Sequence, residues 1–371
     1  MTTSDTWLTT PTPANATGQF PFPQDRRTAN GTYPTTISHA KIKNAYTMWL
    51  GSVMVTSTGA PSGALRVQDP MTGNQTTSEG MAYGMLIAVY MSDKPTFDAF
   101  WQYVQAHMSN GLMSWQITSG GAPNGNGGVN SAADADEDMA WALVMADKQW
   151  PGGTYLTGAK SILSNIKSQE VNGSNNIKDG NFANAGSSHP DYAAPDYYKT
   201  FATVSGDTSW SAVYTGEYSQ LQGAQNATSG LIPDAIGQNT FGFDACRAPW
   251  RVGVDFVWSA SANAKTFVTP MANYFVQYAA QNGGPNSIKI PITPLSGAAG
   301  TNVSGAITGP AAVAAMVSSA NQSFIDASWT YLYSVVLNDL TNPPNYFSST
   351  MGLLSMLTLG GDFVDYTNPP Q

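Results

Sequence analysis

Apolar residues recur at intervals of three and four positions through almost the whole chain from residue 37 onward. That spacing places them on one face of an α-helix, so it predicts a mostly helical protein. The segments between the apolar runs are rich in Gly, Asn and Ser, which is typical of loops. The pattern predicts twelve helices, over residues 37–53, 77–92, 94–108, 135–149, 155–170, 193–204, 210–226, 246–261, 263–281, 309–318, 322–339 and 345–359.

The predicted helices are of two kinds. Residues 79–91 and 139–147 are apolar on nearly every face, as in helices that are surrounded by protein. Residues 155–170 and 210–226 also carry a polar face, as in helices that border solvent. Alternation of the two kinds favours an inner ring inside an outer ring, which is an all-α (α/α)6 barrel. An irregular all-α fold or a solenoid is the alternative, although no sequence repeat of about 34 or 40 residues occurs.

Composition divides the chain into two parts. Residues 1–36 are rich in Pro and Thr and predict an extended N-terminal arm, whereas residues 37–371 predict one domain that holds all the helices. The strongest strand signal, residues 286–294, is expected to be an excursion of a loop. Long loops lie on the surface and often build sites; the longest here are 116–133, 171–190, 227–242 and 282–308.

Charge and composition narrow the class of ligand. Only 11% of the 371 residues are charged, and the formal net charge is −9. Nucleic acids and anionic membranes are bound through patches of Lys and Arg, and this sequence has none. An uncharged polar surface with 11% aromatic residues suits a neutral, hydroxyl-rich ligand. No run of 18 apolar residues predicts a membrane-spanning helix.

Cysteine and histidine offer little chemistry in this sequence. The single cysteine, Cys246, excludes an intrachain disulfide and a cysteine metal cluster, and we expect it to be buried. His39, His107 and His189 are widely spaced and form no HExxH motif. They therefore give little support to a zinc hydrolase or a Ser-His-Asp triad. The sequence predicts no metal site and no organic cofactor.

Three carboxylates stand in unusual surroundings, each near the start of an apolar helix. They are Glu79, Asp134 and Asp244. The simplest interpretation of Glu79 and Asp134 is that they cap helix N-termini, and Asp134 with Glu137 resembles a capping box. The simplest interpretation of Asp244 is an ion pair with Arg247 or with Arg251.

A calcium loop is a further alternative for one of these segments. Asp134, Asp136 and Asp138 alternate as ligands do at the start of such a loop. Met139 and Met145 then stand where the loop needs Gly and Glu, which argues against calcium. By elimination, an enzyme built from these residues would use paired carboxylates, and paired carboxylates suit the hydrolysis of glycosidic bonds.

Two longer motifs make the pattern familiar. They are "SEGMAYGM" at residues 78–85 and "ADADEDMAWALVMADKQW" at residues 133–150. On these motifs the chain resembles glycoside hydrolase family 8 across roughly residues 37–362. The resemblance implies an (α/α)6 fold and the inverting hydrolysis of β-1,4-linked sugars. Further segments that carry it are 111–115, 189–202, 244–258 and 346–357.

The resemblance also implies a role for each matching residue. Glu79 matches the general acid, and Asp244 matches the general base that activates water. Asp134 matches the carboxylate that binds the distorted sugar ring in the central subsite. The other matches are Tyr192, an aromatic residue near the water, Trp115, a stacking platform, and Arg247, a partner of the base.

Three positions depart from the family pattern or leave the match open. Phe243 precedes the base where related cellulases often carry Tyr, and we expect it to line the substrate groove without a hydroxyl. Asp191 stands where Ser is common, so it adds an acid beside the groove. Asp136 is the rival of Asp134 for the sugar-binding role, and we choose Asp134 because it lies at the loop end of its helix.

A general acid must hold its proton near neutral pH, although free Glu has a pKa of about 4.3. The helix N-terminus would lower the pKa of Glu79, whereas burial and a neighbouring carboxylate would raise it. We expect Asp134 to come close enough to supply that neighbouring charge. For inversion, the carboxyls of Glu79 and Asp244 should lie about 6.5–9.5 Å apart, with room for water.

The leading interpretation is an endo-β-1,4-glucanase that acts on cellulose-type or mixed-linkage β-glucan. Chitosanase and xylanase are the alternatives within the fold; a non-catalytic carbohydrate-binding protein and a purely structural helical protein are alternatives of other classes. The expected partner is a polysaccharide, with no nucleic acid and no membrane, and we expect a monomer. A secreted or periplasmic location in a bacterium is expected, with the signal peptide absent from this sequence, because residues 1–24 lack a basic segment followed by an apolar run.

Overall fold

A computed structural model describes residues 18–370 of the chain, except positions 57, 296, 298–299 and 342. These residues form twelve α-helices close to the predicted positions, and the prediction of an all-α (α/α)6 barrel is confirmed. The helices are α1 (His39–Val53), α2 (Ser78–Tyr90), α3 (Lys94–Ala106), α4 (Ala133–Gln149), α5 (Tyr155–Gln169), α6 (Pro195–Ser205), α7 (Trp210–Ala224), α8 (Ala248–Ser259), α9 (Ala262–Asn282), α10 (Gly305–Ala315), α11 (Gln322–Asp339) and α12 (Tyr346–Gly360).

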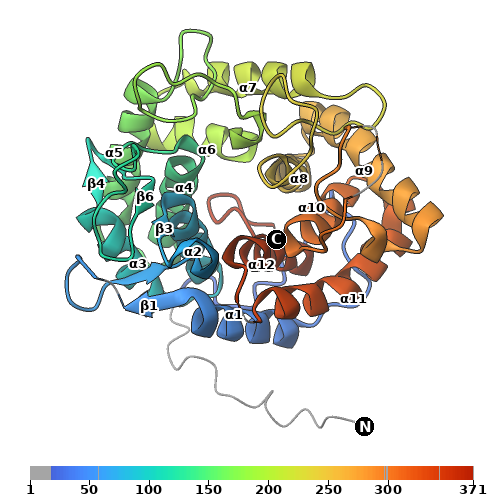
Figure 1. The fold of residues 1–371 in the computed structure, drawn as a ribbon, viewed down its shortest axis with the longest axis horizontal. Coiled ribbons are helices and arrows are strands. Elements are labelled where there is room, and N and C mark those ends of the chain that lie inside the picture. Colours follow the sequence, from blue (N-terminus) through green and yellow to red (C-terminus); the bar gives the residue numbers. More distant parts are fainter. Residues whose placement is uncertain (1–17, 57, 296, 298–299, 342, 371) are drawn as a thin grey trace.

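The even-numbered helices form an inner ring and the odd-numbered helices form an outer ring around it (Figure 1). In the inner ring, α10 buries every residue and α2 buries every residue except Glu79. In the outer ring, α5 buries only one face, through residues such as Ile162 and Ile166. The two kinds of helix that the sequence predicts therefore occupy the two rings, because a helix without a polar face has to be surrounded by protein.

Short antiparallel strand pairs connect some of the helices, and they were too short to predict from sequence. One of these pairs fixes the start of α2, because β3 (Thr76–Thr77) pairs with β6 (Gln116–Ile117) and the backbone N–H of Ser78 donates to the carbonyl of Trp115 at 2.8 Å. The strands are β1 (Met54–Thr56), β2 (Leu65–Val67), β3 (Thr76–Thr77), β4 (Met108–Ser109), β5 (Leu112–Met113) and β6 (Gln116–Ile117), paired as β1–β2, β3–β6 and β4–β5.

The segment 286–294 contains no strand of its own. Ile290 forms an isolated bridge with Asn302, and Ile292 forms one with Phe241. A short 3-10 helix, η4 (Pro285–Ser287), begins the segment. The prediction of a loop excursion here is therefore confirmed.

Aromatic rings fill the end of the barrel at which the inner helices finish. Tyr90 is the last residue of α2, and its ring packs against Phe363 with a centroid distance of 4.4 Å. Phe363 also stacks on Trp258, near the end of α8, at 5.5 Å. Trp141 stacks on Trp258 in turn, at 5.2 Å, and its exposed fraction is 0%. We call this cluster the aromatic end of the barrel.

The described part of the predicted arm, residues 18–36, contains no helix or strand and packs against the aromatic end. The ring of Phe20 stacks on Tyr366 at 4.3 Å, and its carbonyl accepts a hydrogen bond from Gln149 at 2.7 Å. Arg26 donates through Nη1 to the carbonyl of Pro370 at 2.7 Å. Residues 1–17 lie outside the described residues, so the division into an arm over 1–36 and a domain over 37–371 stays a prediction.

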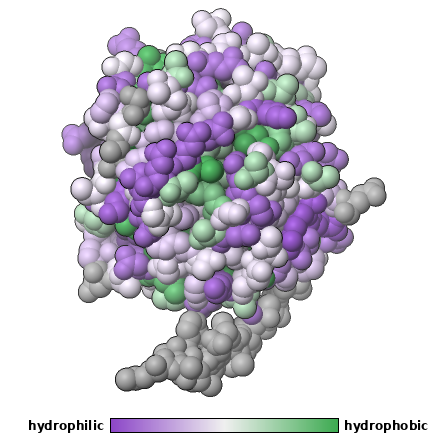
Figure 2. Space-filling view, turned by 90° about the vertical axis from the view of Figure 1, so that its right-hand side faces the viewer, coloured by the Kyte–Doolittle hydropathy of each residue, from purple (hydrophilic) through white to green (hydrophobic). Residues whose placement is uncertain are grey.

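One side of the outer surface is mostly polar or neutral. Figure 2 shows the side on which α9 and α11 lie, and there the apolar residues form small, separate patches. Within the described residues, no helix is both long enough and apolar enough to cross a membrane.

Candidate active site

The carboxylate of Glu79 lies in the first turn of α2, at the end of the barrel opposite the aromatic end. The N-cap of α2 is Thr77, whose Oγ1 accepts from the N–H of Gly80 at 3.0 Å. Glu79 is therefore not the cap, and the capping interpretation of this residue is wrong. Its Oε1 accepts a hydrogen bond from the hydroxyl of Tyr346 at 2.8 Å, and its side chain is 12% exposed.

Arg247 joins Glu79 to two other carboxylates. Nη2 of Arg247 donates to Oε2 of Glu79, and Nη1 donates to Oδ2 of Asp191 at 2.6 Å. Nη1 also lies 3.3 Å from Oδ1 of Asp244. Residues 79 and 244, far apart in sequence, thus contact opposite nitrogens of one guanidinium. We call Glu79, Asp191, Asp244 and Arg247 the arginine cluster.

Asp244 is the exposed member of the arginine cluster. It precedes the 3-10 helix η3 (Ala245–Arg247), and its side chain is 45% exposed. Oδ1 of Asp234 accepts the backbone N–H of Asp244 at 3.2 Å and that of Ala245 at 2.9 Å. These bonds hold the loop so that the Asp244 carboxylate can reach both Arg247 and solvent.

Asp134 lies in the first turn of α4, whose N-cap is Ala132 and makes no side-chain cap. The capping-box interpretation of Asp134 is therefore wrong. Its side chain is 2% exposed, and burial raises its pKa, while Arg247 and Arg251 oppose that rise. Asp134 thus lies deep beside the arginine cluster.

Burial is the main cause of a raised pKa for Glu79. The Arg247 guanidinium opposes the rise, and the charge of Asp134 adds to it. Asp134 therefore approaches Glu79 closely enough to act on its pKa, as the sequence hypothesis required, although loss of hydration has the larger effect. Burial also raises the pKa of Asp138, one turn further along α4, and the charge of Glu79 adds to that rise.

Asp138 forms a bidentate ion pair with Arg251, at 3.0 and 2.7 Å. Arg251 is 1% exposed, so this pair lies inside the barrel. Of the two arginines considered for Asp244, it is therefore Arg247 that forms the ion pair. Asp136 lies by Glu170, and burial together with the charge of Glu170 raises the pKa of Asp136 well above its ordinary value. Asp136 is thus associated with Glu170, and Asp134 is the acid of α4 whose charge acts on the pKa of Glu79.

Aromatic side chains border the arginine cluster. The guanidinium of Arg247 lies 5.8 Å from the ring centroid of Tyr192 and 5.4 Å from that of Phe347. Phe243 is 38% exposed and meets Phe347 edge to face at 6.2 Å. Trp115 is partly exposed and lies beside the start of α2 through its carbonyl contact with Ser78. The site therefore offers ring faces as well as carboxylates.

Two groups near the site escaped the sequence reasoning. Tyr346 belongs to a segment that carries the family resemblance, yet its bond to Glu79 joins positions 267 residues apart. Asp191 was recognised only as an added acid, and its pairing with Arg247 across 56 residues was not foreseen. In each case the sequence names the residue, but only the fold shows its partner.

The single cysteine and two of the histidines are accounted for by burial and by ion pairs. Cys246 is buried, as expected, and no group of three or more potential metal ligands occurs among the described residues. His39 pairs with Asp362 at the aromatic end, and His189 pairs with Asp179. These histidines therefore serve ion pairs.

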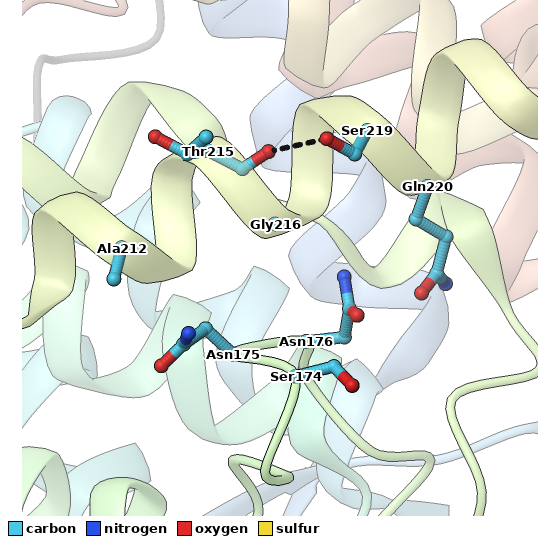
Figure 3. Close-up of a pocket in the computed structure, with 8 residues that line it drawn as sticks. All are labelled: Ser174, Asn175, Asn176, Ala212, Thr215, Gly216, Ser219 and Gln220. Carbon is cyan, nitrogen blue, oxygen red and sulfur yellow. Dashed lines mark hydrogen bonds between the residues drawn. The ribbon is translucent and has the colours of Figure 1, made fainter.

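A depression in the surface lies between α7 and the loop of residues 174–176 (Figure 3). The hydroxyl of Ser219 bonds to the carbonyl of Thr215 there, at 3.1 Å. The lining has no carboxylate and no aromatic ring, so it offers neither acid–base chemistry nor a stacking surface for a sugar. It consists of Ser174, Asn175, Asn176, Ala212, Thr215, Gly216, Ser219 and Gln220.

Comparison with known proteins gives the chain relatives over nearly its whole length. The sequence model described as Glycosyl hydrolases family 8 matches residues 20–361. Endoglucanase C of Ruminiclostridium cellulolyticum is 34% identical over 377 residues, which cover 96% of this chain and 80% of that protein. Beta-glucanase of Niallia circulans is 27% identical and covers 93% of this chain and 91% of its own length.

Solved structures with the same fold include the apo beta-1,3-1,4-glucanase from Paenibacillus sp.X4. It superposes with a TM-score of 0.83 at 25% identity and covers 92% of this chain and 98% of its own. Rex8A from Paenibacillus barcinonensis, complexed with xylose, has a TM-score of 0.74 at 18% identity and covers 91% and 98%. The second likeness concerns the fold alone.

Proposed function

The chain belongs to family 8 of the glycosyl hydrolases, and from this premise we propose that it is an inverting endo-β-1,4-glucanase. In this proposal Glu79 is the general acid and Asp244 is the general base. The observation that carries it is the arginine cluster, in which one guanidinium holds a buried carboxyl and an exposed carboxylate at the same end of the barrel. Such an unequal pair suits two opposite proton transfers.

The acid step rests on the burial of Glu79. A carboxyl in a water-poor site ionises with difficulty, so its pKa rises and it can hold a proton near neutral pH. The protonated Glu79 donates to the glycosidic oxygen as the bond to the sugar breaks. The Tyr346 hydroxyl fixes the carboxyl in place by its bond to Oε1.

The base step rests on the exposure of Asp244. Its carboxylate removes a proton from water, and the water attacks the anomeric carbon on the face opposite the leaving oxygen. The two carboxyls contact different nitrogens of Arg247, and inversion requires them to lie about 6.5–9.5 Å apart with room for the water. Tyr192 borders Arg247 and is placed to orient the water, and Asp134 binds the distorted sugar ring beside Glu79.

A neutral glucan is the substrate that the site and the relatives support best. The relatives include proteins named endoglucanase and beta-glucanase, the ring of Phe243 next to Asp244 is 38% exposed, and the partly exposed Trp115 adjoins the start of α2. A sugar ring packs its apolar face against such a ring. Because the proposed substrate is a polymer, we also propose that the protein is secreted or periplasmic. We propose in addition that it is a monomer.

The test combines a substrate panel with a matched pair of variants. Wild-type protein should release reducing ends from carboxymethylcellulose and mixed-linkage glucan faster than from xylan or chitosan. Glu79→Gln should lose about a thousandfold in kcat, because it removes the transferable proton. The control is Glu217→Gln, which changes a buried glutamate of α7 that has no contact with the arginine cluster and should stay within a few-fold of wild type.

Full activity of Glu79→Gln on every polymer would contradict the assignment of the acid. Preference for xylan would retain the reaction and change the substrate. The stereochemistry is read separately, from the anomer that appears first in the NMR spectrum of the products. The β-anomer would contradict inversion, because an inverted β-link yields the α-anomer.

A further inference from the structure

One carboxylate of the arginine cluster has no part in the reaction proposed above. Asp191 has an exposed fraction of 0%, against 2% for Asp134 and a 45% exposed side chain for Asp244, so no part of Asp191 is open to a bound sugar. Its Oδ2 accepts a hydrogen bond from Nη1 of Arg247 at 2.6 Å, while Nη2 of the same guanidinium contacts Glu79. Asp191 and the proposed acid therefore share one cation.

Contact with Arg247 and the role of general acid place opposite demands on the protonation of Glu79. A guanidinium in contact with a carboxyl stabilises the ionised form, whereas a general acid must enter the reaction protonated. Arg247 is only 6% exposed, so it needs a counter-charge inside the protein. If Glu79 were the sole close partner of Arg247, the ion pair would take away the proton that the reaction needs.

Resting on the proposed function, we propose that Asp191 is the counter-ion of Arg247, a positioning residue whose charge allows Glu79 to keep its proton. Asp191 holds Nη1 at 2.6 Å, closer than the 3.3 Å that separates the same nitrogen from Asp244. The proposed base therefore stays loosely held by Arg247, and its exposed carboxylate is free to bind water. Asp191, which stands where Ser is common in the family, thus acts through its contact with Arg247.

The surrounding charges agree with this role. Burial raises the pKa of Asp191 to about 7, against the influence of Arg247, and Asp244 raises it as well. Asp191 therefore gains its charge as the pH rises through the neutral range. The other titratable groups that face the cluster are Tyr83, Asp134, Asp138, His189, Tyr192, Asp234, Cys246 and Tyr346.

The test is the pH dependence of kcat in Asp191→Asn. Asparagine keeps an acceptor oxygen for Arg247 but removes the charge. The basic limb of the profile, which reports loss of the proton from Glu79, should move to lower pH by about one unit, so the rate above the limb falls about tenfold. The acidic limb should stay in place because Asp191 is uncharged there, and KM should stay within about twofold because Asp191 does not touch the sugar.

A second variant and a remote control complete the experiment. Asp191→Ser removes both the charge and the reach to Arg247, and it should move the basic limb at least as far as Asn does. The control is Asp362→Asn, which removes a buried carboxylate that pairs with His39 beyond the end of α12, about 20 Å along the helix from Tyr346. Its limbs should match those of wild type. Circular dichroism checks that each variant is folded.

An unmoved basic limb in both Asp191 variants, with activity abolished in Glu79→Gln, would overturn the inference and leave the proposed function intact. An equal shift in Asp362→Asn would also overturn it, because the effect would then belong to net charge. Failure of the proposed function has a different signature, since Glu79→Gln would then remain active whatever the Asp191 variants do.

Discussion

Carboxylates gather at the N-terminal ends of the inner helices, whereas aromatic rings gather at their C-terminal ends. At the first end, Asp134 and Asp191 are buried, and Oδ1 of each has no hydrogen-bond partner among the described residues. A buried acceptor without a partner costs about 1–3 kcal/mol. The arginine cluster is thus an arrangement that folding alone would not favour.

At the aromatic end, packing of large rings predominates. Phe363 and Tyr366 are each 3% exposed, and their rings pack against Tyr90 and Phe20. Burying a large side chain stabilises a protein by roughly 1.5–3 kcal/mol. The comparison indicates that packing at the aromatic end stabilises the fold, whereas the buried carboxylates at the other end destabilise it and serve the reaction. Changes at the two ends should therefore separate activity from stability.

The largest effect is expected at the exposed member of the arginine cluster. Asp244→Asn should lower kcat about a thousandfold, because the amide cannot accept the proton of water. Its side chain is 45% exposed, so the free energy of unfolding should change by less than about 0.5 kcal/mol. Steady-state kinetics and urea unfolding measure the two quantities. A kcat within tenfold of wild type would remove Asp244 as the base.

The next effect is expected at the aromatic end. Phe363→Ala should lower the free energy of unfolding by about 3 kcal/mol, because it leaves a cavity between Tyr90, Trp250 and Trp258. Below the unfolding temperature, kcat and KM should match those of wild type. A large loss of kcat in the folded variant would break the division between the two ends. Phe243→Ala, at an exposed ring, is the control for stability.

A smaller effect should appear in the pH dependence of stability. Burial raises the pKa of Glu170 and of Glu217 to about 7, and that of Asp339 to about 6. A raised folded-state pKa contributes stability that is complete below the unfolded value, near 4.3, and is lost as pH rises through about 7. Each of these two glutamates should thus contribute about 2 kcal/mol more stability at pH 5 than at pH 8, which urea unfolding at the two pH values measures.

Glu170→Gln sharpens that measurement. Glutamine resembles the protonated acid and keeps an acceptor for the hydroxyl of Ser131. The difference in unfolding free energy between pH 5 and pH 8 should shrink relative to wild type. An unchanged difference would show that Glu170 does not take part in the loss of stability.

The smallest effect is expected at the position before the base. Phe243→Tyr adds a hydroxyl to a ring that is 38% exposed and has no contact with the Asp244 carboxylate in the structure. Both kcat/KM and the free energy of unfolding should stay close to wild type, within threefold and about 0.5 kcal/mol. A tenfold change in preference between carboxymethylcellulose and mixed-linkage glucan would show that this ring selects the sugar linkage.

Sequence periodicity predicted the helices well because each helix has either one apolar face or no polar face. The start of α10 was the poorest boundary, predicted at 309 and found at Gly305. Gly and Pro residues there weaken the helical signal, yet packing requires the glycines. A Cβ at Gly305 would lie 2.4 Å from the carbonyl oxygen of Ser348, and a Cβ at Gly309 would lie 2.5 Å from the side chain of Ser355.

The candidate site was predictable as a set of residues but not as an arrangement. Motifs pointed to Glu79, Asp134 and Asp244, because acids entering apolar helices are rare and expensive to bury. Periodicity carries no information on which of these acids would share Arg247, since that contact depends on how the inner helices meet around the ring. The pairing of Arg247 with Asp191 also depends on how distant segments meet in the fold, so periodicity could not predict it.

The contact between Arg26 and Pro370 has a practical consequence for handling the molecule. It brings the two extremities of the described chain together at the aromatic end, away from the arginine cluster. A bead or sensor surface coupled through the last residues would therefore hold every molecule with its carboxylates facing outward. Large polymers should then still reach the arginine cluster of the immobilised protein, because that end faces the solution.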